Sequence, residues 1–145
     1  MSLRRSFASA ALAGAVLLLV PGFAQAKQIS SVTACGAAGH CRTVAVHGDA
    51  GMGLLPGGRG GGPPARRVPF YRLNLTIGVN GQVEGHVYVL YAPTLGLSAI
   101  DEPGVDLVWE TVLPAARRVA ERATRGLTPR PAGRMPIERS PRATS

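Results

Sequence analysis

The stretch from Phe70 to Tyr91 constrains the fold more than any other part of the chain. Apolar and polar residues alternate along both of its halves, which is the two-residue period of half-buried β-strands. Asn80-Gly81 lies between the two halves, and this dipeptide is a strong hairpin signal. The sequence therefore predicts an antiparallel hairpin with one buried face.

The pairing of apolar residues across this hairpin predicts its loop. A two-residue loop would place Ile77 opposite Glu84, so apolar and polar side chains would share a face. A three-residue loop over 79–81 pairs Ile77 with Val83 instead. Because a one-residue slip turns a whole strand over, the apolar matching favours the three-residue loop, with Gly81 at positive φ.

Residues 1–26 have the features of a secretory signal peptide. Arg4 and Arg5 precede an apolar run over 8–20, and Ala24-Gln25-Ala26 is a small-x-small cleavage pattern. The run is shorter than the ~20 residues that span a bilayer. We expect cleavage after Ala26, a secreted protein that can stay associated with the cell envelope, and no transmembrane span after cleavage.

The whole chain carries 16 Lys+Arg against 8 Asp+Glu, a formal net charge of +8. Such a balance favours anionic partners. Lys27 is the only lysine, however, and the abundance of Arg, Ala, Gly and Pro is typical of a GC-rich genome. The charge therefore has two interpretations, a functional surface or a bias of genome composition.

Cys35 and Cys41 lie at the two ends of a glycine-rich turn. In an exported protein this arrangement favours a disulfide, which closes a small loop and contributes about 2 kcal/mol. The alternative is a metal site that adds His40 and His47, although the Cys-His-Cys-His order lacks the paired spacing of zinc modules. Two short predicted strands flank the turn, 29–34 and 42–47.

The segments around the two hairpins are less regular. Glycine and proline in 48–67 predict a flexible linker. Two more strands are expected after the central hairpin, an edge strand within 95–100 and another over 105–110. From residue 128 to 145, prolines and arginines with few apolar residues predict a disordered tail.

A helix is predicted to begin at Pro114. Its apolar residues recur at three-four spacing, and Gly126 suits a left-handed C-terminal cap. These apolar residues are Leu113, Ala116, Val119, Ala120, Ala123 and Leu127. The other face carries the candidate anionic-surface residues Arg117, Arg118, Arg122 and Arg125. A basic helix face is either solvated or in contact with an anionic surface.

Signatures of catalysis are missing from the sequence. It contains no nucleophile elbow, no paired-cysteine metal signature and no His-Glu-x-x-His helix. His86, expected beside Asn74 on the polar side of the hairpin, could act as a general base only with a partner that the sequence does not supply. Aromatic residues are too few for a base-stacking platform. We therefore expect no catalytic residue, no cofactor, no metal and no specific nucleic-acid ligand.

The pattern resembles a group of small uncharacterised exported proteins of high-GC Gram-positive bacteria. The shared features are the Cys35 to Cys41 hairpin, the strand after Pro69, Tyr91-Ala92-Pro93, and the segment from Trp109 into a Pro-Ala-Ala helix. This resemblance covers most of the mature chain and implies no activity, ligand or site residue.

These observations predict an α+β fold. It would consist of a signal peptide over 1–26, one small domain over 27–127 with a flexible insertion at 48–67, and the tail. The domain would have a small antiparallel sheet and one C-terminal amphipathic helix. The leading functional hypothesis is an exported non-catalytic domain that contacts anionic cell-envelope polymer or lipid, or another exported protein. The alternative is a small extracellular enzyme or metal binder that uses His86 or the cysteine-histidine loop.

Overall fold

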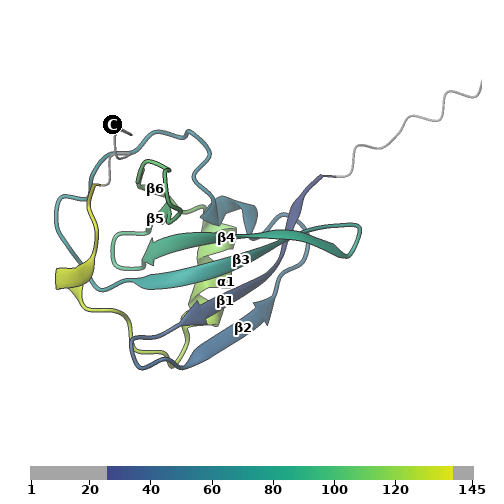
Figure 1. The fold of residues 1–145 in the computed structure, drawn as a ribbon, viewed down its shortest axis with the longest axis horizontal. Helices are drawn as coiled ribbons and strands as arrows, with labels where there is room; N and C mark the ends of the chain where they lie inside the picture. Colours follow the sequence, from purple (N-terminus) through teal and green to yellow (C-terminus); the bar gives the residue numbers. More distant parts are fainter. Residues whose placement is uncertain (1–25, 139–145) are drawn as a thin grey trace, which may run out of the picture.

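The computed structural model describes residues 26–138 and has one antiparallel sheet in the order β2-β1-β3-β4-β5-β6 (Figure 1). One α-helix, α1, lies on one face of this sheet, so the predicted α+β fold with a C-terminal helix is confirmed. The predicted signal peptide, apart from Ala26, and the end of the predicted tail lie outside the described residues. No helix within 26–138 is long and apolar enough to cross a membrane.

The elements follow the chain in a simple order. The first hairpin comes from β1 and β2, the second from β3 and β4, and short strands then lead into the helix. Their bounds are β1 Gln28–Cys35, β2 Cys41–Ala45, η1 Met52–Leu54, β3 Tyr71–Val79, β4 Gln82–Ala92, β5 Leu97–Ile100, β6 Glu110–Thr111, α1 Pro114–Thr124 and η2 Ala132–Arg134.

The loop of the central hairpin differs from the prediction. Val79 pairs with Gln82, so the loop has two residues, and both take positive φ, 55° at Asn80 and 74° at Gly81. This is the conformation that a tight primed turn requires. The three-residue loop expected from the sequence is therefore wrong.

A β-bulge restores the apolar matching that this short loop would otherwise lose. The register shifts by one residue of β4 after Gly78 pairs with Val83, and beyond the shift Leu75 faces Val87. One extra residue in a strand turns the following side chains to the other face. The requirement for apolar pairing was correct, but a bulge meets it in place of a longer loop.

The main core lies between the sheet and α1. The helix contributes small buried residues, which let it pack closely on the strands. The predicted apolar face is correct except at Leu113, which is 44% exposed. Strand and helix residues meet in this core, including Ile29, Val32, Leu73, Leu75, Val89, Tyr91, Ala116, Val119, Ala120 and Ala123.

A second core covers part of the opposite face of the sheet. Leu90 points into it from β4, and Trp109 and Met135 close it, each 1% exposed. Of the expected strand over 105–110, only Glu110 joins the sheet, in the short strand β6. β5 pairs with both β4 and β6, so it is not an edge strand.

The C-terminal segment 128–138 is part of this second core, which corrects the prediction of a disordered tail for these residues. Phe70 and Arg130 exchange two backbone hydrogen bonds, with N···O distances of 3.1 and 2.8 Å. Arg67 Nε donates to the Met135 carbonyl at 3.0 Å. The segment is held by backbone pairing and one buried side chain, neither of which leaves a periodic pattern in the sequence.

The glycine-rich insertion 48–67 is also folded where a flexible linker was expected. It forms η1, and Leu54 is fully buried in the main core. Ser98 Oγ donates to the Leu54 carbonyl at 2.8 Å. Gly61 then makes an isolated bridge with Glu110. The insertion therefore seals one end of the sheet.

Candidate functional site

Three of the four candidate arginines form a stripe along α1. Arg118, Arg122 and Arg125 recur at the four- and three-residue spacing that places side chains on one helix face. They surround a surface hollow of about 380 Å³ beside the insertion. The hollow is also lined by Ala50, Ala115, Val119 and Glu121. We call Arg118, Arg122 and Arg125 the arginine stripe.

The side chains of the arginine stripe have no protein partner within residues 26–138. The ion pairs in this part of the chain are Lys27–Glu84, Arg59–Glu110 and Arg72–Asp101. No guanidinium of the stripe donates a hydrogen bond to another described residue. The stripe thus offers unpaired guanidinium donors around a hollow with an apolar component.

Arg42 extends this basic surface, and no local sequence pattern predicts its position there. It belongs to β2, 83 residues before Arg125, and its Nη1 donates to the Arg125 carbonyl at 2.8 Å. A cation near the C-terminal end of a helix is favourable because the last carbonyls have no helical partner. Arg42 therefore both caps α1 and adds a positive charge beside the stripe.

Arg117, the fourth candidate, is separate from the stripe. Its guanidinium lies over Gly96, where a Cβ atom would collide with it. It is also close enough to Tyr91 to act on that phenol. Burial raises the pKa of Tyr91, Glu121 raises it further, and Arg117 acts in the opposite direction. Arg117 therefore lies against the sheet rather than in the candidate binding surface.

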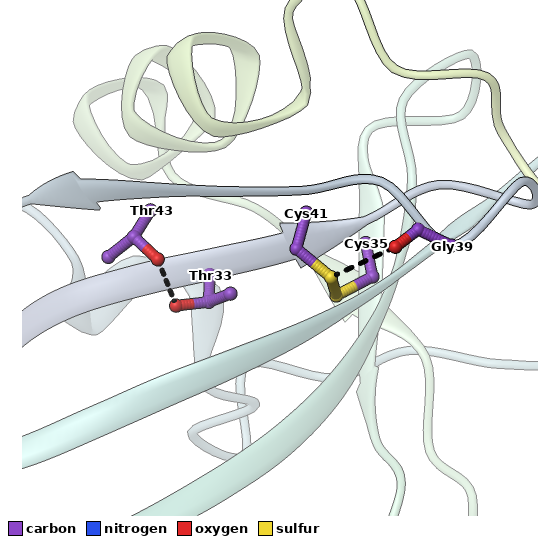
Figure 2. Close-up of a disulfide and its surroundings, with 5 residues drawn as sticks. All are labelled: Thr33, Cys35, Gly39, Cys41 and Thr43. Carbon is purple, nitrogen blue, oxygen red and sulfur yellow. Dashed lines mark hydrogen bonds between the residues drawn. A yellow bond between two sulfur atoms is a disulfide. The ribbon is translucent and has the colours of Figure 1, made fainter.

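The cysteine loop contains the predicted disulfide between Cys35 and Cys41 (Figure 2). Both sulfur atoms are thus bonded to each other, and neither is a thiolate that could bind a metal. Within residues 26–138 there is no group of three or more His, Cys, Asp or Glu side chains placed to hold a metal ion. Next to the disulfide, the hydroxyls of Thr33 and Thr43 lie 2.7 Å apart across the two strands.

His86 has a different neighbour from the one expected. The bulge in β4 moves it opposite Thr76, whose Oγ1 lies 3.4 Å from His86 Nδ1, and Tyr88 faces Asn74. The His86 side chain is exposed on the sheet. Within residues 26–138, no third side chain is hydrogen-bonded to the Thr76 hydroxyl or the His86 imidazole, so these residues do not form the oriented nucleophile–base pair of a hydrolytic site.

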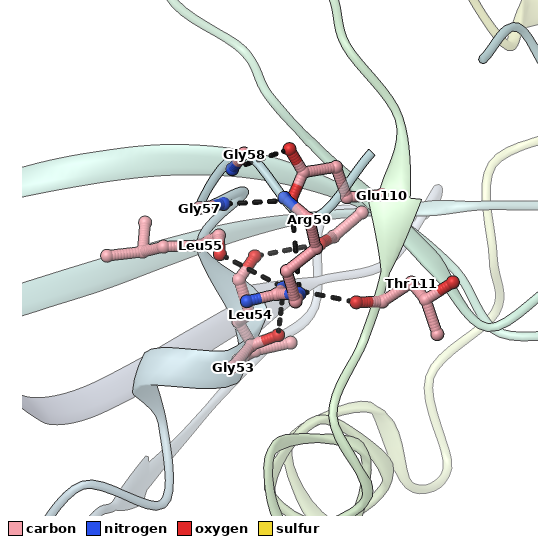
Figure 3. Close-up of polar contacts among 9 residues, drawn as sticks. Gly53, Leu54, Leu55, Gly57, Gly58, Arg59, Glu110 and Thr111 are labelled. Carbon is pink, nitrogen blue, oxygen red and sulfur yellow. Dashed lines mark hydrogen bonds and ion pairs between the residues drawn. The ribbon is translucent and has the colours of Figure 1, made fainter. Parts of the chain in front are cut away.

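Glu110 is 3% exposed and holds the insertion in place (Figure 3). Its carboxylate accepts hydrogen bonds from the backbone N–H groups of Gly57, Gly58 and Arg59 at 2.8, 2.9 and 3.3 Å. Arg59 Nε lies 3.9 Å from the same carboxylate. Arg59 Nη2 in turn donates to the carbonyls of Gly53, Leu55 and Thr111.

These contacts decide the charge state of Glu110. Burial acts to raise its pKa, but the three N–H donors and Arg59 outweigh burial, so the pKa lies below its ordinary value of 4.5. The carboxylate oxygens already accept hydrogen bonds from the protein's own backbone, so Glu110 has a structural role. Sequence reasoning missed it because its partners are 51 to 53 residues away.

A last contact lies on the outer face of the sheet. Arg72 Nε is 2.8 Å from Asp101 Oδ2, and the Arg72 guanidinium stacks 3.8 Å from the centre of the Tyr88 ring. In the strand register Arg72 pairs directly with Leu90, and its side chain reaches diagonally to Tyr88. Arg72 is thus paired, whereas no arginine of the stripe has an ion-pair partner in the described part of the chain.

No protein-family model, curated protein or solved structure matches this chain.

Proposed function

We propose that this chain is an exported, non-catalytic domain that contacts anionic polymer or lipid of the cell envelope through the arginine stripe. The observation that carries the proposal is the set of three guanidinium groups around one hollow that have no partner among residues 26–138. Arginine presents a planar fork of donors that suits phosphate and carboxylate groups. The proposal assigns no reaction to the protein.

The electrostatics of the surface support an anionic ligand. Among residues 26–138, Glu121 is the only acidic residue that lines the hollow, against three arginines, and Arg42 lies beside Arg125. Like charges gathered on one surface repel each other, and an anion relieves that repulsion. The apolar wall formed by Ala50 and Val119 would contact the uncharged part of such a ligand.

Export is the second part of the proposal. The leader pattern of residues 1–26 supports it, and the disulfide is of a kind that persists in oxidising compartments. We also propose that the chain belongs with the small exported proteins of high-GC Gram-positive bacteria that its pattern resembles. An N-terminal sequence of exported protein beginning Lys-Gln-Ile-Ser would support cleavage after Ala26, and retained Met1 would contradict it.

Co-sedimentation with anionic vesicles and with anionic cell-wall polymer, across a salt series, tests the binding. Exposed charges are screened beyond about 8 Å at physiological ionic strength, so binding should weaken as salt rises. Arg118→Gln and Arg122→Gln should each weaken it. Arg66→Gln is the matched control, because Arg66 is exposed and lies outside the hollow.

Three results would contradict the proposal. They are no binding at low salt, binding that is indifferent to salt, and an equal loss in all three variants. Capture of a protein from envelope extract by both wild type and Arg122→Gln, without vesicle or polymer binding, would favour a protein partner at another surface. Truncation after Leu127 is not a suitable test, since it removes Met135 from the second core.

A further inference from the structure

A second basic hollow lies between the disulfide hairpin and the C-terminal segment. Its volume is about 440 Å³, and it shares no residue with the hollow of the arginine stripe. Three stretches of chain far apart in the sequence form its walls. The lining residues are Gly36, Ala37, Phe70, Arg130, Pro131 and Arg134.

The walls of this hollow are fixed by backbone hydrogen bonds. The N–H of Ala37 donates to the Thr128 carbonyl at 2.8 Å, which ties the hairpin turn to the C-terminal segment. Phe70 and Arg130 exchange the two bonds that tie the same segment to the start of β3. The disulfide closes the turn that carries Gly36 and Ala37. The hollow therefore belongs to the folded core and is not a feature of a loose tail.

Two arginines give this hollow its charge, and none of the described residues that line it is acidic. Arg130 is half-buried and Arg134 is exposed. Within residues 26–138 neither guanidinium forms an ion pair or donates a hydrogen bond. A guanidinium has five N–H donors, and partial removal from water without an acceptor is unfavourable. An anion that binds between the two side chains would satisfy them.

We propose that this hollow binds a phosphate group carried by a small polyol, as in a glycerol phosphate unit. Two arginine forks can share the oxygens of a tetrahedral phosphate, and guanidinium–phosphate pairs are often bidentate. The volume falls at the lower end of the range for small-molecule sites, roughly 300–1,000 Å³, which leaves room for more than the phosphate. Ala37 and Pro131, the exposed apolar residues of the lining, would contact the carbon chain of the polyol.

This site is independent of the arginine stripe. The stripe runs along one face of a single helix and suits a polymer or membrane, whereas the second hollow has walls from three stretches of chain that are far apart in the sequence. Loss of one site should therefore leave the other intact. Failure of the stripe hypothesis would not remove this proposal, because the two tests use different residues.

The test is an amide NMR titration of the oxidised full-length mature chain with glycerol 3-phosphate at constant ionic strength. We expect saturable shifts at Gly36, Ala37 and Arg130. Arg130→Gln and Arg134→Gln should each weaken binding about tenfold, equivalent to ~1.4 kcal/mol. Arg66→Gln and Arg122→Gln, which keep the hollow unchanged, should bind as wild type does.

Two further experiments test whether the bound phosphate group belongs to a free phosphate compound or to a lipid headgroup. Inorganic phosphate alone should bind more weakly than glycerol 3-phosphate, because it lacks the carbon chain. Vesicles containing phosphatidic acid, compared with phosphatidylcholine vesicles, test a lipid headgroup as the source. Binding to these vesicles that glycerol 3-phosphate displaces, and that Arg130→Gln weakens, would place the headgroup in the hollow.

Several results would overturn the proposal. One is the absence of saturable shifts at Gly36 and Ala37 with either phosphate compound. Another is equal binding of acetate, which would reduce the hollow to a weak general anion site. A third is unchanged affinity in both Arg130→Gln and Arg134→Gln when their amide spectra show an intact fold.

Discussion

Replacing Met135 by alanine tests whether the C-terminal segment is part of the folded domain. Met135 is 1% exposed and packs in the second core with Val68, Phe70 and Trp109. Its Sδ accepts a hydrogen bond from the Val68 N–H at 3.3 Å. The substitution removes most of this side chain and leaves the exposed residues around it unchanged.

The expected cost follows from the depth of burial. Replacing a fully buried methionine by alanine costs about 2–5 kcal/mol, with the larger values where the surroundings cannot collapse. Trp109 and the sheet form much of the surroundings, which favours a persistent cavity. At roughly 4 °C for each kcal/mol, a value suited to a domain near 100 residues, the Tm should fall by roughly 8–20 °C.

Thermal melts followed by circular dichroism measure this change. Arg134→Ala is the control for loss of a side chain in the same segment, because Arg134 is exposed, and its Tm should stay near that of wild type. Met135→Leu conserves the volume and should cost less than about 1.5 kcal/mol. If Met135→Ala has the same Tm as the wild type, Met135 is not buried in the second core and the C-terminal segment does not pack as described.

Three further predictions concern local features. The folded pKa of Glu110 lies below its ordinary value of 4.5. The contribution of the ionised carboxylate to stability should therefore be complete above pH 4.5 and be lost as the pH falls through the folded pKa. Glu110→Gln should abolish this part of the acid-unfolding curve. Gly81→Val should lower the Tm and Asn80→Gly should preserve it, because both loop residues take positive φ, which glycine adopts and valine does not. Equal Tm values for the two variants would refute the two-residue loop. Reduction of Cys35–Cys41 should lower the free energy of unfolding in urea by about 2 kcal/mol, and an unchanged midpoint would show that the loop constraint is unimportant.

Sequence reasoning was most successful where the contacts are local. The central hairpin, the helix from Pro114 and the disulfide could all be predicted, because each depends on residues close in the chain. The left-handed cap at Gly126, with φ of 77°, also follows from its neighbours. For the candidate site, the helical spacing of Arg118, Arg122 and Arg125 was readable from the sequence.

The hairpin register shows the limit of such reasoning. The sequence by itself determined that apolar residues of β3 and β4 must share a face. It did not determine how, because a longer loop and a bulge satisfy the same condition. The structure has the bulge, and so His86 faces Thr76 and not Asn74.

Only the tertiary structure decided whether the two irregular segments, 48–67 and 128–138, are folded. The insertion is held by Glu110, and the C-terminal segment by Met135 and the Phe70–Arg130 bridge. The tertiary structure also places Arg117 apart from the stripe and Arg130 beside the disulfide hairpin. Composition predicts disorder when few apolar residues are available to offset chain entropy. One deeply buried side chain and a few backbone hydrogen bonds to residues more than 50 positions away can offset that entropy, and no local pattern records them.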